Sequence, residues 1–116
     1  MSKKEVEQLR SRRWFGGGPR STEHTAHILQ AGFSREEVEG RPVIGIINTW
    51  SDMNPCHAHL KDRAEAVKRG VWQAGGFPVE LPAISLSESN VKPTTMLYRN
   101  FLAMETEELI RSHSVD

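Results

Sequence analysis

The stretch PVIGIIN, residues 42–48, decides the fold of this chain. It is a continuous run of mostly apolar, β-branched side chains, and residues typical of turns bound it on both sides. A run of this kind is typical of a strand that is buried on both faces of a parallel sheet. The stretch therefore predicts one buried strand, around which the rest of the chain must be arranged.

The residues that follow this strand alternate between helical and extended patterns. Residues 60–74 carry apolar side chains at helical spacing with charged side chains between them, which predicts an amphipathic helix closed by two glycines. Residues 78–84 form a second, shorter apolar run, whose prolines weaken its ends as a strand. A polar loop over residues 85–95 and a further helix over residues 96–112 are expected next.

The residues before the strand predict a helical lead-in. Residues 20–31 have a helical pattern, and Ser34 with Glu37 makes a capping box at the start of a short helical turn. Residues 1–19 end in three glycines and a proline, which cannot continue a helix, and they are expected to form an N-terminal arm or linker.

The order of elements is helix, strand, helix, strand, helix, which is one βαβ unit with flanking helices. The fold class is therefore α/β, the N-terminal part of a parallel-sheet α/β/α domain, which is incomplete because a third strand is expected to begin after the last residue. The βαβ portion is expected to span residues 20–116.

Composition limits the classes of partner and the compartment. The 116 residues include 15 Lys and Arg against 15 Asp and Glu, so neither a nucleic acid nor a membrane surface is an expected partner. No apolar run approaches the roughly 20 residues of a membrane span, and the polar N-terminus is no secretory signal. A single cysteine indicates a reducing, cytoplasmic setting.

Two loops are expected to form a ligand site. In open parallel sheets, ligands bind outside the carboxyl ends of the strands. The loop after the first strand carries Asp52 and Cys56, and the loop after the second carries Glu88. If the two strands are neighbours, both loops project from the same edge, and Cys56 lies near Glu88.

The local residues leave the role of Cys56 open. Asn54 is expected to cap a helix whose first residue is Pro55, so that Cys56 lies in the first turn, where the helix dipole favours a thiolate. A buried, inert thiol is an equal alternative from local context. A third hypothesis is a cysteine nucleophile with His57 as its base.

Three pieces of the sequence together resemble a known family. They are NTWSDMNPCHAH at residues 48–59, AGGFPVELP at 74–82 and SLSESNVKPTTM at 85–96. In this order they resemble the start of the dihydroxy-acid and phosphogluconate dehydratases, and within that family the sugar-acid dehydratases of the arabinonate and xylonate kind. The resemblance runs from about residue 10 to residue 116.

The resemblance implies an activity and two cofactors. The family removes water from a 2,3-dihydroxy acid to give a 2-keto acid, here a 2-keto-3-deoxy acid from a small-molecule sugar acid. It uses an iron–sulfur cluster held by three cysteines, with 2Fe-2S favoured over 4Fe-4S, and a nearby Mg²⁺. By position in the motifs, Cys56 matches the first cluster cysteine and Glu88 matches a Mg²⁺ ligand. The full-length enzyme is expected to be a homo-oligomer.

The same resemblance limits what this chain can do by itself. The family needs two further cluster cysteines, and this sequence has only one cysteine. The expected function is therefore that of an N-terminal fragment of a dehydratase, inactive alone. The alternative is a non-catalytic interaction module derived from the same family.

Overall fold

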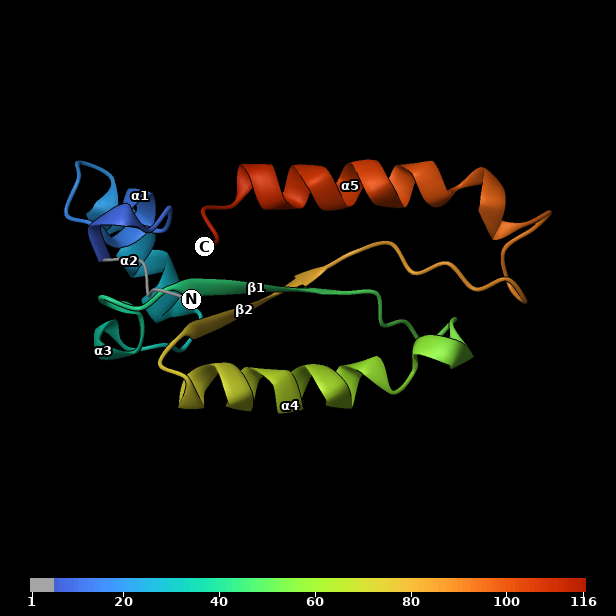
Figure 1. Cartoon of the computed structure of the whole chain (residues 1–116), viewed down its shortest axis with the longest axis horizontal. Helices are drawn as coiled ribbons and strands as arrows, with labels where there is room; N and C mark the ends of the chain where they lie inside the picture. Colours follow the sequence, from blue (N-terminus) through green and yellow to red (C-terminus); the bar gives the residue numbers. More distant parts are fainter. Residues whose placement is uncertain (1–5) are drawn as a thin grey trace.

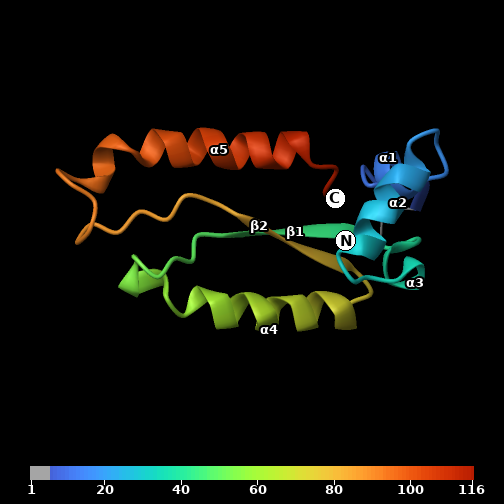
Figure 2. The ribbon, with the colours of Figure 1, turned by 180° about the vertical axis from the view of Figure 1, so that it is seen from behind.

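Three layers make up the structure, a computed structural model that describes residues 6–116. A two-stranded sheet lies in the middle, helix α4 runs along one side of it, and helix α5 runs along the other (Figure 1). The view from behind shows the same order of layers, with the short N-terminal helices gathered at one end (Figure 2). The predicted α/β class, with the sheet incomplete, is confirmed.

The sheet consists of β1 (Val43–Asn48) and β2 (Phe77–Pro82), which pair in parallel. The register sets Val43 opposite Phe77 and Asn48 opposite Pro82. Helix α4 (Leu60–Gln73) connects the strands, so the predicted βαβ unit is confirmed. The second strand lies earlier than the predicted residues 78–84, because the N–H of Ile84 donates to a carboxylate of α5 instead of extending the strand.

The core is small and lies at the amino ends of the strands. Val38, Val43 and Phe77 are buried in it, with aromatic side chains around them. The ring of Phe77 lies 5.0 Å from that of Phe33 and 5.6 Å from that of Trp72, measured between centroids. Burial of such side chains contributes roughly 1.5–3 kcal/mol each. This cluster anchors the sheet to α4 and to the N-terminal helices.

One prediction about β1 is wrong. Its sequence predicted burial on both faces, but only its first and last residues, Val43 and Asn48, are buried, and the four between them are half-buried. The difference has a physical reason: β2 is the only neighbouring strand in residues 6–116, so one edge of β1 stays open.

The N-terminal helices are short. They are η1 (Val6–Gln8), α1 (Arg12–Phe15), α2 (Ser21–Gln30) and α3 (Arg35–Val38). The predicted capping box is present, and the Ser34 N–H donates to Oε2 of Glu37 at 2.6 Å. The first five residues of the predicted arm lie outside the described part. The described part of the arm contacts the last helix, α5 (Arg99–Ser112), where Arg10 Nη2 donates to the carbonyl of Ile110 at 3.3 Å.

Helix α5 (Arg99–Ser112) follows a short turn, η3 (Thr95–Leu97), so the predicted helix over 96–112 is confirmed except for its first turn. A hydrogen bond of 2.8 Å from the Ile84 N–H to Glu105 Oε2 ties α5 to the chain after β2. Several of its large apolar side chains are nevertheless exposed, namely Phe101, Met104 and Ile110. No helix in residues 6–116 is long and apolar enough to cross a membrane.

Candidate functional site

The loops that follow β1 and β2 meet at the carboxyl edge of the sheet. Asn54 Nδ2 donates to Ser85 Oγ at 3.0 Å, and Asn90 Nδ2 donates to the carbonyl of Met53. In Figure 1 both loops lie at the end of the molecule opposite the N-terminal helices. The predicted meeting of the two loops is therefore confirmed, and hydrogen bonds join the loop of Cys56 to that of Glu88.

Asn54 holds this junction from a buried position. It occupies the N-cap position of a short turn, η2 (Pro55–His57), but its side chain makes no capping bond. The side chain, only 1% exposed, turns to Ser85 instead, and its Oδ1 has no hydrogen-bond partner within residues 6–116. The predicted cap is wrong for this reason: the amide bridges two loops rather than satisfying the turn that follows it.

Cys56 lies in η2, not in the first turn of α4, which begins only at Leu60. A single three-residue turn has little of the aligned dipole that a long helix carries, so the helix-start argument for a thiolate loses its support. Cys56 is exposed, which contradicts the alternative of a buried, inert thiol. Its sulfur is open to a ligand from outside the described residues.

His57 is held by its own loop. Its Nδ1 lies 3.0 Å from Oγ1 and 3.1 Å from the carbonyl oxygen of Thr49, so an Nδ1–H can donate to that carbonyl. Within residues 6–116 no hydrogen bond joins His57 to Cys56. The geometry therefore gives no support to the hypothesis of a cysteine nucleophile activated by His57.

Glu88 is exposed, and the start of the next turn holds its carboxylate. Its Oε2 accepts hydrogen bonds from the Thr95 hydroxyl and from the Thr95 N–H, the latter at 3.2 Å. The bond from the Thr95 side chain is the main cause that lowers the pKa of Glu88, and Thr94 adds to it. Glu88 is thus ionised at neutral pH, which is the form that a hard cation binds.

A cavity of about 470 Å³ lies between these two loops and the first half of α5. Its walls are largely apolar, and Arg99 contributes a permanent positive charge. The lining residues are Thr49, His57, Ile84, Leu86, Thr95, Arg99, Leu102 and Ala103. Thr95 lines the cavity and also donates to Glu88, so the carboxylate lies next to a lining residue, although Glu88 does not itself line the cavity.

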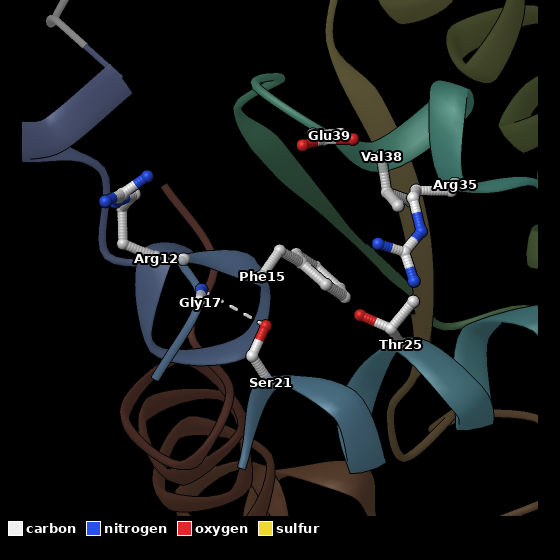
Figure 3. Close-up of a pocket in the computed structure, with 9 residues that line it drawn as sticks. Arg12, Phe15, Gly17, Ser21, Thr25, Arg35, Val38 and Glu39 are labelled. Carbon is white, nitrogen blue, oxygen red and sulfur yellow. Dashed lines mark hydrogen bonds between the residues drawn. The ribbon is translucent and has the colours of Figure 1, made fainter. Parts of the chain in front are cut away.

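A second cavity, of about 260 Å³, lies among the N-terminal helices (Figure 3). Arg12, Phe15 and Arg35 are among its lining residues, and the Gly17 N–H donates to Ser21 Oγ at 3.2 Å beside it. This cavity lies at the end of the molecule opposite the loops that follow β1 and β2 (Figure 1), so it is not part of the candidate site.

The donors at the loops fit the expected cofactors by type but not by number. A thiolate is a suitable ligand for iron–sulfur clusters, and a carboxylate suits Mg²⁺. Residues 6–116 contain no group of three or more His, Cys, Asp or Glu side chains placed to hold a metal ion. Cys56 and Glu88 would therefore each need further ligands from elsewhere.

The sequence interpretation missed a polar network that fixes the start of the first loop. Asn48 Nδ2 donates to Glu80 Oε1 at 2.9 Å and to the carbonyl of Leu60 at 3.3 Å. Glu80 Oε2 lies 2.6 Å from Lys68 Nζ, and the hydrogen bond from Lys68 is the main cause that lowers the pKa of Glu80. Asn48 Oδ1 accepts from the Trp50 N–H at 3.0 Å. The available signal was Glu80, the one charged side chain within the second apolar run.

Comparison with known proteins identifies relatives of the chain. The sequence model of the dihydroxy-acid/6-phosphogluconate dehydratase N-terminal family matches residues 41–116. A 6-deoxy-6-sulfo-D-gluconate dehydratase of Pseudomonas putida is 63% identical over 97% of the chain, and an L-arabinonate dehydratase of Rhizobium leguminosarum is 50% identical over 94%. A D-xylonate dehydratase of Caulobacter vibrioides is 33% identical. The chain spans about a fifth of the length of these curated relatives.

Proposed function

Because the chain belongs to the dihydroxy-acid/6-phosphogluconate dehydratase family, we propose that it is the N-terminal portion of a hydro-lyase acting on a sugar acid. The reaction removes water from a 2,3-dihydroxy acid and yields a 2-keto-3-deoxy acid. The observation that carries this proposal is the junction of the loops of Cys56 and Glu88 at the carboxyl edge of a parallel sheet. The names of the relatives support a sugar acid as the class of substrate.

We assign Cys56 as one ligand of an iron–sulfur cluster, 2Fe-2S in preference to 4Fe-4S, and Glu88 as one ligand of Mg²⁺. The chemistry that such cofactors supply when bound is Lewis-acid activation of the departing hydroxyl and of the substrate carboxylate. Two contacts within this chain support the proposed ligands. Thr95 donates to the Glu88 carboxylate and lowers its pKa, and Asn54 donates to Ser85 and so joins the Cys56 loop to the Glu88 loop.

By itself the chain is expected to be inactive. One cysteine and one carboxylate do not complete either metal site, and residues 6–116 contain no group of three or more His, Cys, Asp or Glu side chains that could hold a metal ion. The remaining ligands and the catalytic base would come from the rest of a full-length enzyme, which we propose to be a homo-oligomer. Anaerobic reconstitution of the isolated chain with iron and sulfide should give no stable, stoichiometric cluster.

A chimera tests the proposal in a complete enzyme. The matched segment of the P. putida dehydratase is replaced by this chain, which is 63% identical to it, and 2-keto acid formation and iron content are measured. Cys56→Ser should remove activity and reduce bound iron. Glu88→Gln should reduce activity and raise the Mg²⁺ concentration needed for half of the maximal rate.

Two matched control variants show whether changes in iron content and Mg²⁺ dependence are specific to Cys56 and Glu88. His59→Gln changes an exposed neighbour of Cys56, and Glu107→Gln removes an exposed carboxylate on α5, so neither should alter iron content or Mg²⁺ dependence. A Cys56→Ser chimera that keeps full activity and iron would refute the assignment of Cys56. A folded chimera that forms no keto acid from any sugar acid tested would overturn the proposed activity.

The exposed apolar side chains of α5 favour a second candidate, a non-catalytic interaction module. Phe101 is 59% exposed and Met104 is 63% exposed, so this side of α5 is available to a partner. Under this proposal the isolated chain binds the full-length relative, and the chimera folds without activity. An active chimera, together with an isolated chain that does not bind the full-length relative, would exclude the interaction module.

A further inference from the structure

We propose that Asn54 is a positioning residue that couples the two proposed metal ligands through its hydrogen bond to Ser85. The consequence is that Mg²⁺ binds more tightly when the iron–sulfur cluster is present, and that the cluster is held more tightly when Mg²⁺ is present. The inference rests on the proposed function, because it takes Cys56 as a cluster ligand and Glu88 as a Mg²⁺ ligand. It gives a role to two residues that are not themselves proposed as ligands.

Two hydrogen bonds join the loops, and on one loop they bracket Glu88. The first runs from Asn54 Nδ2 to Ser85 Oγ at 3.0 Å, and the second runs from Asn90 Nδ2 to the carbonyl of Met53. Ser85 comes three residues before Glu88, and Asn90 comes two residues after it. The segment that carries the carboxylate is therefore joined to the other loop on both sides.

On the other loop, both bonds lie directly before Cys56. Met53 and Asn54 are adjacent, and Cys56 follows two residues after Asn54. The backbone of Asn54 belongs to the same turn, since its carbonyl accepts from the His57 N–H at 2.9 Å and its N–H donates to the carbonyl of Ser51 at 3.2 Å. Because its backbone and its side chain are both bonded, Asn54 ties the turn of Cys56 to the second loop.

Burial makes the bond of Asn54 the stronger of the two connections. Its side chain is 1% exposed, so water does not compete with Ser85 for the amide. A hydrogen bond in such a setting is electrostatically stronger than one in water. Asn90 is exposed, so water competes with its bond to Met53. Asn54 therefore carries most of the connection between the loops.

Stability alone does not explain an amide at this position. The Oδ1 atom of Asn54 is buried without a hydrogen-bond partner within residues 6–116. Such an atom costs free energy, because it has lost its bonds to water and has gained none in the protein. An apolar side chain of similar size would avoid this cost, but it would leave the turn of Cys56 without its bond to Ser85. What the amide provides is the bond between the loops.

The loop of Glu88 is itself well ordered. Ser87 is 5% exposed, and its carbonyl accepts from the N–H groups of Asn90 and Val91 at 3.1 and 2.8 Å. Thr95 donates to the Glu88 carboxylate from the next turn. A displacement of this loop at Ser85 is therefore expected to move Glu88 as well.

Shared order is the physical source of the coupling. A cofactor held by Cys56 restricts the first loop, and the bond from Asn54 to Ser85 extends that restriction to the loop of Glu88. The second cofactor then loses less conformational freedom when it binds. By linkage, each cofactor raises the affinity for the other by the same factor, and such factors are typically about 5 to 150.

Binding of Mn²⁺, an EPR-visible substitute for Mg²⁺, tests the proposal in the chimera with the P. putida dehydratase. The dissociation constant of Mn²⁺ is measured with the cluster loaded and with the cluster removed, and the ratio of the two constants reports the coupling. The loaded chimera should bind Mn²⁺ about fivefold or more tightly. In Asn54→Ala this ratio should fall to about one, whereas a merely structural role would weaken binding in both forms alike and keep the ratio.

Ser85→Ala removes the same hydrogen bond from the other loop and leaves the turn of Cys56 unchanged. It should lower the ratio as much as Asn54→Ala does, and the double variant should lower it no further. Ser85→Ala therefore gives the answer if Asn54→Ala does not hold a cluster. Asn90→Ala, which removes the exposed bond, should lower the ratio less, and the exposed control His59→Gln should keep it.

Four outcomes would overturn the proposal. They are equal affinity for Mn²⁺ in the loaded and cluster-free chimera, an unchanged ratio in Ser85→Ala, and a ratio that is lost in Asn90→Ala but kept in Asn54→Ala. The fourth is failure of both Asn54→Ala and Ser85→Ala to hold a cluster with or without Mg²⁺, because the bond would then be required for the cluster itself.

The proposed function fails on different results. A Cys56→Ser chimera that keeps its iron, or a Glu88→Gln chimera that binds Mn²⁺ unchanged, would remove the ligand assignments themselves. If both of these variants behave as expected and the ratio does not depend on Asn54 or Ser85, only the positioning role of Asn54 is wrong.

Discussion

Truncation of Phe77 to alanine tests whether the small core holds this fold together. Phe77 is completely buried, between the rings of Phe33 and Trp72 at 5.0 and 5.6 Å. Loss of a buried phenylalanine ring costs about 3–5 kcal/mol, because the lost burial and the remaining cavity both contribute. A domain is typically stabilised by about 5–15 kcal/mol, so Phe77→Ala should remove a large fraction of the stability of this chain.

Urea unfolding followed by circular dichroism measures this loss. With a slope of about 1–3 kcal/mol per molar, a loss of about 4 kcal/mol lowers the midpoint by roughly 2 M. The slope itself should change little if the variant still unfolds in one step. A variant that is already unfolded without urea would also agree with the expectation, since the core has few other buried apolar side chains.

Phe101→Ala is the matched control, since it removes the same ring from an exposed position. Phe101 is 59% exposed on α5, and alanine favours a helix, so the free energy of unfolding should change by no more than about 0.5 kcal/mol. Equal losses of unfolding free energy in Phe77→Ala and Phe101→Ala would refute the idea that the small core around Phe77 holds the fold together. A loss at Phe101 that grows with protein concentration would show that another molecule covers α5.

Two further predictions concern glycines and pH. Gly70→Ala, inside α4 with open space around it, should stabilise the chain by about 1 kcal/mol, whereas Gly76→Ala should destabilise it by about 1–3 kcal/mol, because the new Cβ would lie 2.9 Å from Val71 Cγ1. The bond from Lys68 keeps the folded pKa of Glu80 below its unfolded value of about 4.3, so its contribution is complete above that pH and is lost as pH falls through the folded value. Glu80→Gln should therefore make stability less dependent on pH below about 5.

Thermal melts across a pH series measure both sets of variants. Glu107→Gln removes one member of an exposed ion pair on α5, and serves as the control for Glu80→Gln. The stability of Glu107→Gln should depend on acidic pH in the same way as the stability of the unchanged chain. An identical acid dependence in all three proteins would contradict the role given to Glu80, and equal effects of alanine at Gly70 and Gly76 would contradict the packing described around Gly76.

The elements that the sequence predicted well are those with a strong local pattern. The apolar run of β1, the periodic α4 and the capping box of Ser34 and Glu37 are all present, because local sterics and the separation of apolar from charged side chains specify them. The expected meeting of the two loops followed from the parallel βαβ topology alone, and hydrogen bonds between the loops confirm it.

The candidate site was harder to predict in its details. Asn54 next to Pro55 has the pattern of a helix cap, but its amide bonds to Ser85, 31 residues further along the chain. The network of Asn48 and Glu80 likewise joins residues from two strands. No local pattern specifies such bonds, because they depend on how the strands are aligned.

The sequence by itself determined the class of the fold, the order of its elements and the family, because these are carried by local patterns and by motifs within single segments. Only the tertiary structure decided that Cys56 is exposed in a separate turn, that Thr95 holds Glu88, and that β1 keeps an open edge. The physical reason is that exposure, hydrogen bonding and strand edges depend on neighbours that are distant in the sequence, and these neighbours are brought together only when the chain folds.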